Sequence, residues 1–154
     1  MSKIVRTIAN ILYPFIFIFG LYVIMHGHLT PGGGFQGGAV VASGIALIAV
    51  AYGRERLEEL IKEKNLSIFE SLGALAFIGL AFLGIGVTFF YNSLANSGSL
   101  FGNPTPVGPN PGDLNTAGLL PLMNLAVGLK VLAGLGAVVI VMMLGISSLR
   151  RVRK

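Results

Sequence analysis

The stretch His26-Gly27-His28-Leu29-Thr30-Pro31-Gly32-Gly33-Gly34-Phe35-Gln36-Gly37-Gly38 is the pivot around which the chain is organised. It separates two long apolar runs, and it is too rich in glycine and too close to a proline to continue either run as an ordinary helix. We predict a tight turn between two membrane helices, in which glycines let backbones approach closely. The residues expected to form this non-helical backbone feature are Pro31, Gly32, Gly33, Gly34, Phe35, Gly37 and Gly38.

The spacing Gly32-x-Gly34-x-x-Gly37 also matches the dinucleotide-binding fingerprint. That motif requires a short strand before it and an acidic residue about 20 residues later, in a strand-helix-strand unit. Here a helix-length apolar segment precedes the glycines, and Glu55 belongs to a charged cluster. No Lys-Ser or Lys-Thr pair follows, as a Walker loop would need. The context therefore argues against a nucleotide site.

The composition is that of an integral membrane protein. Of 154 residues, 54% are hydrophobic and 11% are charged, and the mean hydropathy is +0.82, whereas soluble domains carry about 25% charged residues. The net charge is +5, but the basic residues other than Lys130 lie at the chain ends and in one loop. This distribution sets membrane topology and does not form a nucleic-acid-binding patch.

Four apolar runs are long enough to cross a bilayer as helices. We predict an all-α integral membrane protein, multi-pass in the cell membrane, whose residues 1–154 form a single membrane domain. Lys3 and Arg6 precede the first run like the start of a signal peptide, but no small-residue cleavage site follows, so we expect this span to be retained. The predicted spans cover residues of about 8–26, 35–52, 68–91 and 119–149.

The basic residues also predict the orientation. The N-terminus, the segment 54–64 and the C-terminus are basic, whereas the turn 26–34 and the loop 92–115 contain no lysine or arginine. With four spans these two sets fall on opposite sides of the membrane. We therefore expect both termini in the cytoplasm.

The segments between the runs carry further local signals. Segment 54–64 is expected to be a helical loop lying on the membrane, with the ion pairs Arg54–Glu58 and Glu58–Lys62 and one apolar face made by Leu57, Leu60 and Ile61. The sequence Ser67-Ile68-Phe69-Glu70 matches a capping box and predicts the start of the third helix. The loop 92–115 is rich in proline, glycine and asparagine; a loop of this length is usually functional or packed on a partner.

Small residues predict close helix contacts. Gly34, Gly38, Ala42 and Ala46 recur at every fourth position of the second run and give it a narrow face. In the fourth run, helix packing is assigned to Gly118, Pro121, Asn124 and Gly128.

Lys130 is the most informative residue, since no other basic residue lies inside a predicted span. A lysine at a helix centre costs about 2.5–3.5 kcal/mol on insertion scales. Its helical neighbours are small (Ala126, Ala133, Gly134 and Ala137), so it should face other helices and not lipid. A buried ammonium needs a partner, which could be water, helix carbonyls or a carboxylate of another subunit. Lys130 then either contributes to an ion or proton path or only stabilises packing.

His26 and His28 lie at the outer end of the first span. Imidazole titrates near neutral pH and can relay protons, so a proton route and a plain interfacial role both remain open. A His-x-His pair can bind a metal, but no further ligand is apparent and the chain has no cysteine. We predict no metal, no cofactor and no catalytic residue, because no nucleophile, base and orienting group occur together.

Two motifs resemble a known family. The stretch from Gly27 to Gly38, together with Thr116-Ala117-Gly118-Leu119-Leu120-Pro121-Leu122-Met123-Asn124-Leu125-Ala126-Val127-Gly128-Leu129-Lys130-Val131, is similar to the MnhB/MrpB-like subunit of multisubunit Mrp-type sodium/proton antiporters. Order, spacing and the four-span layout agree over nearly the whole chain. The same subunit type resembles a component of archaeal membrane-bound hydrogenase and its sulfur-reducing relative.

The resemblance implies an accessory, non-catalytic membrane subunit of a cation (Na+)/proton antiporter module. Its partners would be the bilayer and other membrane subunits of an antiporter or respiratory complex, with no nucleic acid. Lys130, His26 and His28 are the candidate ion-path residues. Two alternatives remain at this point: a purely structural scaffold subunit, and an independent small transporter acting as a homo-oligomer.

Overall fold

The computed structural model describes residues 2–53, 56–57, 61–105 and 113–152, with side chains of the last helix described as far as Met143 and at Gly145. Within these ranges the fold is all-helical. Four helices are long and apolar enough to cross a membrane, the last of them over Leu120–Met143, which confirms the predicted all-α class and the four helices of membrane-spanning length. They are α1 (Lys3–Met25), α2 (Gly34–Tyr52), α4 (Glu63–Phe82) and α5 (Leu120–Val152).

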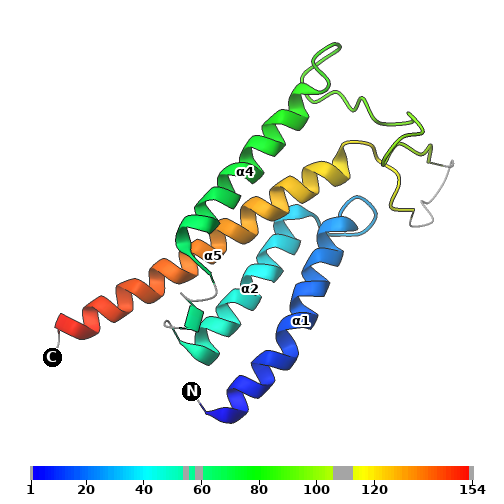
Figure 1. Ribbon diagram of the computed structural model, residues 1–154. Coiled ribbons are helices and arrows are strands. Elements are labelled where there is room, and N and C mark those ends of the chain that lie inside the picture. The colour runs from blue at the N-terminus through cyan, green and yellow to red at the C-terminus, as the bar shows by residue number, and fades with distance from the viewer. Residues whose placement is uncertain (1, 54–55, 58–60, 106–112, 153–154) are drawn as a thin grey trace.

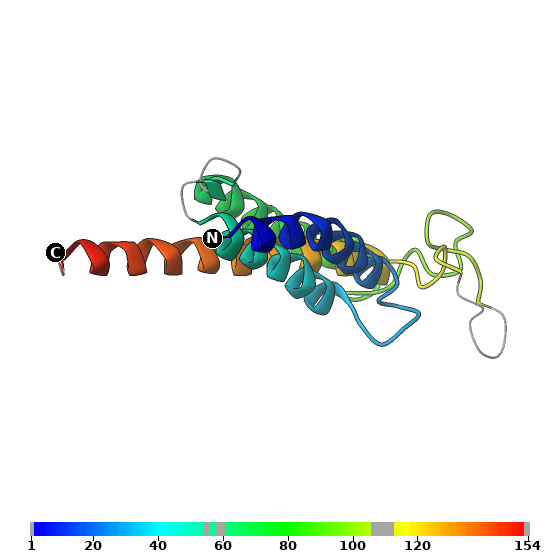
Figure 2. The same ribbon diagram turned by 90° about the horizontal axis from the view of Figure 1, so that it is seen from below.

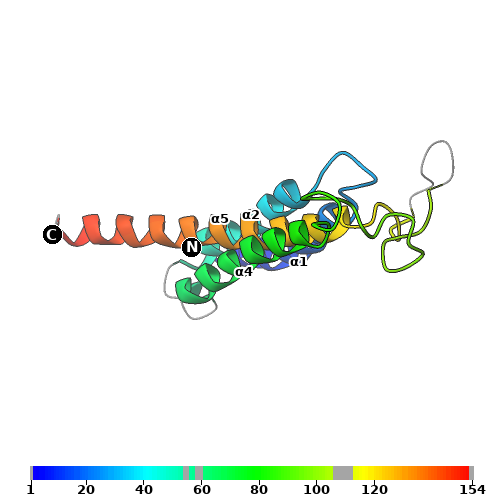
Figure 3. The same ribbon diagram turned by 90° about the horizontal axis from the view of Figure 1, so that it is seen from above.

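The helices are arranged in the order α1, α2, α5, α4. Helix α2 packs between α1 and α5, and α4 packs on the other flank of α5 (Figure 1). The glycine turn and the loop that follows α4 lie at one end of the bundle, and both chain ends lie at the other (Figures 2 and 3). The C-terminal part of α5 continues beyond the other helices.

Glycines bring the backbone of α2 close to both neighbours. A Cβ atom placed on Gly37 would lie 2.6 Å from the carbonyl oxygen of Gly20 in α1, and one placed on Gly38 would lie 2.8 Å from the carbonyl oxygen of Gly128 in α5. Both distances are shorter than the 3.0 Å below which real Cβ contacts are essentially not found, so neither position has room for a side chain. The predicted narrow face of α2 thus contacts α5, and Gly37 provides a second narrow face towards α1.

The glycine-rich stretch is less irregular than predicted. The non-helical part ends at Gly33, whose φ is 159° and which forms the N-cap of α2. Gly34, Phe35, Gly37 and Gly38 were expected in a non-helical feature and are helical instead. The reason is that the three glycines, which lack side chains, make close helix contacts, while the turn itself needs only the residues before Gly34.

Helix α4 begins earlier than the capping-box pattern predicts. Its N-cap is Lys62 and its first residue is Glu63, so Ser67 and Glu70 are interior positions. The Ser67 carbonyl accepts a hydrogen bond of 2.9 Å from Ser71 Oγ inside the helix. The capping-box interpretation is therefore wrong. Glu63 in the first turn favours this earlier start, since a negative charge is stabilised at a helix N-terminus.

Helix α4 also ends at Phe82, whereas the apolar run continues to Tyr91. After Phe82 the chain folds back, and Phe90 N–H donates to the carbonyl of Ala81 at 3.1 Å. The ring of Phe90 lies 5.6 Å from that of Phe77. The aromatic residues after Phe82 thus pack against their own helix and do not lengthen the span.

The short connection between α2 and α4 contributes to the core. Leu57 is only 1% exposed and belongs to a buried cluster at this end of the bundle, and Ile61 packs against it. The predicted partners Arg54, Glu58 and Leu60 lie outside the described residues. The described part of the segment therefore inserts an apolar side chain among the helices. The other buried members of the cluster are Ile45, Ala49, Leu66, Ala133 and Ile140.

Candidate functional site

Lys130 lies near the middle of the membrane-crossing part of α5. At a rise of about 1.5 Å per residue it is ~15 Å from Leu120 and ~20 Å from Met143 along the helix axis. The hydrocarbon core of a bilayer is about 30 Å thick. A bilayer crossed by Leu120–Met143 would therefore hold Lys130 well inside its hydrocarbon core, measured from either end of this stretch.

The root of the Lys130 side chain lies on the contact between α4 and α5. A Cβ atom on Gly73 would be 2.8 Å from the Lys130 amide nitrogen and 2.9 Å from its Cβ. The rest of the side chain is exposed on the surface of this chain, and among the described residues no hydrogen bond or ion pair reaches its ammonium group. The helices of this chain hold the base of Lys130 but leave its charge open to a neighbour.

Among the acidic residues in the described part of the chain, Glu70 lies nearest to this position. Its carboxylate packs against Gly134 of α5, where an added Cβ atom would lie 3.4 Å from Oε1 and 3.8 Å from Oε2. Glu70 is half-buried and lies ~10 Å along α4 from Glu63. The sequence pattern favoured a capping role for Glu70, whereas the structure places its carboxylate two turns inside α4.

An apolar groove continues from Lys130 between α4 and α5 towards the loop end of the bundle. Its volume is about 520 Å³, and it is open to the surface of the chain. Ala126 and Leu129 border it next to Lys130. The two helices thus touch at Gly73 and Glu70, and the groove separates them between Lys130 and the start of α5. The remaining lining residues are Ala76, Gly79, Leu80, Leu83, Leu122 and Leu125.

Asn124 fixes the glycine turn onto α5. Its Oδ1 accepts a hydrogen bond of 3.4 Å from the amide of Gly34, the first residue of α2. A Cβ atom on Gly27 would lie 2.6 Å from Gly33 Cα and 2.7 Å from Asn124 Nδ2. The two sequence motifs therefore meet in space, and Gly27 has to be glycine because two other segments occupy the space of a side chain.

The two histidines lie in this turn at the end of α1. The ring of His26 stacks on Tyr22 at 4.2 Å between centroids. Both ring nitrogens of His28 are buried and make no hydrogen bond within the described part of the chain. Burial lowers the pKa of His28, and the charge of His26 lowers it further; nearby backbone groups of Met25, Asp113 and Leu114 act in the opposite direction.

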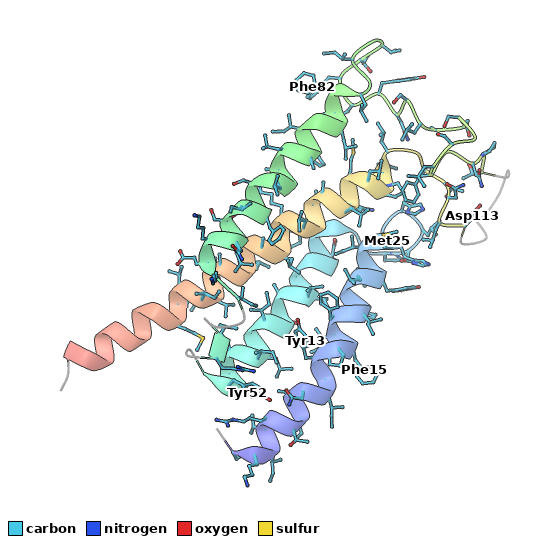
Figure 4. All side chains as sticks on the ribbon, in the orientation of Figure 1. Tyr13, Phe15, Met25, Tyr52, Phe82 and Asp113 are labelled. Atoms are coloured by element: carbon cyan, nitrogen blue, oxygen red, sulfur yellow. The ribbon has the colours of Figure 1, made fainter. Side chains whose placement is uncertain are left out.

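The predicted site residues do not form one cluster. Asp113 lies beyond the Met25 end of α1 (Figure 4), on the same side as the histidines, whereas Lys130 is six residues past Asn124 and so ~9 Å deeper along α5. Of the turn residues, Phe35 is 60% exposed and points away from the bundle core, while the Pro121 side chain is fully buried at the start of α5.

The end of the long loop is held by asparagine side chains that the sequence did not single out. Asn92 Nδ2 donates to the carbonyl of Ala117 and Asn92 Oδ1 accepts from the amide of Leu119, both at 2.9 Å. Gly118 between them has φ 62° and leaves room only for hydrogen, since an added Cβ would meet Asn92 Oδ1. The Gly118 conformation and the Asn92 amide together set the start of α5.

Asn115 and Asp113 order the last part of the loop. Asn115 Oδ1 accepts from the amide of Phe101, and its carbonyl accepts from Asn103 N–H at 2.9 Å. Asp113 Oδ1 accepts from the amide of Asn115 at 2.8 Å. In the described ranges 92–105 and 113–119 there is no helix or strand, as predicted. Among the described residues, no group of three or more metal-ligating side chains occurs.

The family of the chain follows from comparison with known proteins. A family profile described as a domain related to the MnhB subunit of Na+/H+ antiporter matches residues 4–146. The chain belongs to this MnhB family. The putative antiporter subunit mnhB2 of Staphylococcus haemolyticus is 38% identical over 95 residues, covering 60% of this chain and 66% of that protein. These matches confirm the resemblance inferred from the two motifs.

Two further relatives extend the comparison. An uncharacterised protein of Methanocaldococcus jannaschii is 40% identical over 119 residues, or 75% of this chain. A chain of the membrane-bound sulfane sulfur reductase, an archaeal respiratory membrane complex, is 30% identical with a TM-score of 0.71 over 92% of this chain. The present chain spans only 42% of the length of the first protein and 58% of the length of the second.

Proposed function

We propose that this MnhB-family chain is a non-catalytic membrane subunit of a cation (Na+)/proton antiporter module. The module belongs to a multisubunit complex, either an antiporter or a respiratory complex of the hydrogenase or sulfur-reducing type. Family membership and the likeness to a chain of an archaeal respiratory complex support this proposal. The chain contributes charge to an ion path that neighbouring subunits complete.

The observation that carries the proposal is the position of Lys130. Its ammonium is exposed at membrane depth with no ion pair in the described part of the chain. A lysine at the helix centre costs about 2.5–3.5 kcal/mol. Charged side chains inside membrane spans commonly mark ion or proton pathways. A neighbouring subunit or a water-filled path beside α4 and α5 removes that cost.

A purely structural scaffold accounts for the glycine contacts but not for the lysine. Gly37 and Gly38 already hold α2 against its neighbours through backbone contacts. Packing alone would favour an apolar side chain of similar length at position 130. The scaffold alternative therefore predicts that Lys130→Met is tolerated.

The test compares substitutions in the assembled complex. Lys130→Met keeps side-chain length and removes the charge, and Lys64→Met is the matched control because Lys64 is exposed at the start of α4. Exchange is measured in inverted membrane vesicles, and assembly by the subunit composition of the purified complex. We expect Lys130→Met to assemble normally and to lose at least about tenfold in exchange rate, with Lys64→Met close to wild type. Unchanged exchange by an assembled Lys130→Met complex would overturn the proposal and leave the scaffold role.

We also propose that both termini face the cytoplasm, on the strength of the basic residues at that end of the bundle. The chain has no native cysteine, so single cysteines report topology directly. A membrane-impermeant maleimide should label Thr105→Cys in intact cells, and Lys64→Cys only after permeabilisation. The reverse pattern would invert the orientation.

A further inference from the structure

Glu70 and Lys130 occupy matching positions on one helix contact. Gly73 of α4 faces Lys130, and one turn nearer the start of α4, Glu70 faces Gly134, which lies one turn further along α5. The helices therefore run antiparallel at this contact. Each charged residue stands opposite a glycine of the facing helix, so both helix backbones can approach while both charges are kept.

These two charges are isolated from all others in the spans. In the described parts of α1, α2 and α4, and of α5 as far as Met143, every other charged residue lies within one turn of a helix end. Helix α2 contains no charged residue. A lone carboxylate and a lone ammonium, one turn apart on the same contact, are costly unless they act on each other or on a shared ligand.

We infer that Glu70 and Lys130 form one site for a monovalent cation. In this site the Glu70 carboxylate takes up the cation, either a proton or Na+, and Lys130 neutralises the carboxylate when the cation has left. The inference rests on the proposed role in cation/proton exchange, and it assigns to this chain the group that holds the transported charge.

The structure supports such an exchange of positive charges. The Glu70 carboxylate lies against the Gly134 notch, so no side chain of α5 screens it on that side. Lys130 is anchored at Gly73 by its backbone and Cβ, while its four-carbon stem is free to rotate on the exposed surface. An arriving cation displaces the ammonium from the carboxylate, and a departing cation is replaced by it. The Glu70 carboxylate is therefore paired with one positive charge in both states, which limits the electrostatic cost of the carboxylate in the membrane.

The charged groups around the site are few. On α5, Lys130 is the one charged residue between Leu120 and Met143. On α4, Glu63 and Lys64 lie about two turns from Glu70, towards the start of the helix, with Lys62 just before them. The connection before α4 adds Arg56, which has an interaction of its own. Lys130 is the cation placed to act on the Glu70 carboxylate at membrane depth.

The first experiment detects the carboxyl group without measuring transport. Dicyclohexylcarbodiimide, which reacts with protonated carboxyl groups in apolar surroundings, is added to the purified complex, and the modified residue is located by peptide mass spectrometry. We expect modification at Glu70 and none at Glu63, which is exposed at the start of α4. Protection by added NaCl, compared with choline chloride, assigns Na+ as the ligand. If modification of Glu70 decreases with rising pH and NaCl has no effect on it, the ligand is the proton. Absence of modification at Glu70 would overturn the inference.

The second experiment separates this inference from the proposed function. Exchange in vesicles is compared for Glu70→Gln, Lys130→Met and the double variant, with Glu63→Gln as the matched control. If the residues form one site, the double variant should be no slower than the slower single variant, because each substitution already disables the site. Two results would overturn the site while the proposed function survives. One is a loss of exchange in the double variant equal to the product of the two single losses. The other is normal exchange by an assembled Glu70→Gln complex when the Lys130→Met complex is inactive. Normal exchange in both single variants would overturn both.

Discussion

Replacing Gly34 with alanine adds one carbon atom where α2 meets α5. That atom would lie 2.9 Å from the Gly128 amide nitrogen and 2.9 Å from Val127 Cβ, and it would also clash with the Asn124 carbonyl. Ordinary contacts begin at 3.4 Å. Because the obstructing atoms belong to backbone and Cβ positions, no rotamer change relieves the clash, and the helices must separate by roughly 0.5 Å or more.

The expected cost follows from two contacts. Overpacking of a close contact destabilises by about 1–3 kcal/mol. Separation of the helices also weakens the hydrogen bond from the Gly34 amide to Asn124 Oδ1, worth about 0.5–1.5 kcal/mol. We therefore predict that Gly34→Ala lowers the free energy of unfolding by about 2–4 kcal/mol. Gly34→Val should prevent assembly altogether, since a branched side chain fills more of the same space.

The assay is the fraction of intact complex recovered by size-exclusion chromatography after heating detergent-extracted samples to a series of temperatures. Gly79→Ala is the matched control, because no atom lies within 4 Å of its added carbon and alanine is a better helix former than glycine by about 1 kcal/mol. This control should be at least as stable as wild type. Equal thermal stability of Gly34→Ala and Gly79→Ala would refute the close backbone contact between α2 and α5.

Two further predictions concern the loop end of the bundle. Burial lowers the pKa of His28, so protonation of His28 favours a turn that has separated from the helices. The packing of the turn against the helices should therefore be complete above pH of about 6.5 and weaken as the pH falls below that value. Hydrogen exchange of residues 26–30, corrected for intrinsic rates, should therefore accelerate in acid in the wild type but not in His28→Gln, and equal acid sensitivity in both would contradict this. Asn92→Ala removes two hydrogen bonds to the start of α5, so exchange of the Leu119 amide should accelerate roughly tenfold to a hundredfold. Ser93→Ala, at an exposed neighbouring position, is the control, and an unchanged Leu119 rate in Asn92→Ala would exclude the bridging role.

The sequence predicts the features that depend on local composition. Four apolar runs, a lysine inside the last of them and two glycine-containing motifs are all visible without knowledge of the fold. The depth of Lys130 follows from its distance to the ends of its own helix. The number of membrane-crossing helices likewise depends only on the length and hydropathy of each run.

Glu70 could not be assigned in this way, because its contact is with a residue far away in the chain. The local pattern Ser67-x-x-Glu70 fits a capping box, and nothing in the neighbouring sequence contradicts it. In the fold the helix starts at Glu63, and Gly134 provides the notch in which the carboxylate lies. The available signal was the spacing itself, since Glu70 lies two turns inside the helix once Glu63 is taken as its start.

The end of α4 shows a second limit of local patterns. Hydropathy treats Phe89 and Phe90 as a continuation of the span, although their rings pack on each other at 4.7 Å and fold back towards Phe77 and Phe82. Likewise, the amides of Asn92 and Asn124 bond to backbone that is distant in sequence. Hydrophobicity identifies the segments to be buried, but their partners depend on how the helices are arranged.

The two flanks of α5 differ in what they can bind. On the α2 side, Gly38 and Gly128 bring the backbones too close to admit anything else. On the α4 side, the contact carries Glu70 and Lys130 and then opens into an apolar groove. At the other edge of the bundle, α1 presents residues such as Phe15, 66% exposed and directed away from its neighbours (Figure 4), and this surface suits lipid. A charge at membrane depth does not suit lipid, so the proposed function requires protein neighbours at the α4–α5 flank, and α1 and α2 need only hold that flank in place.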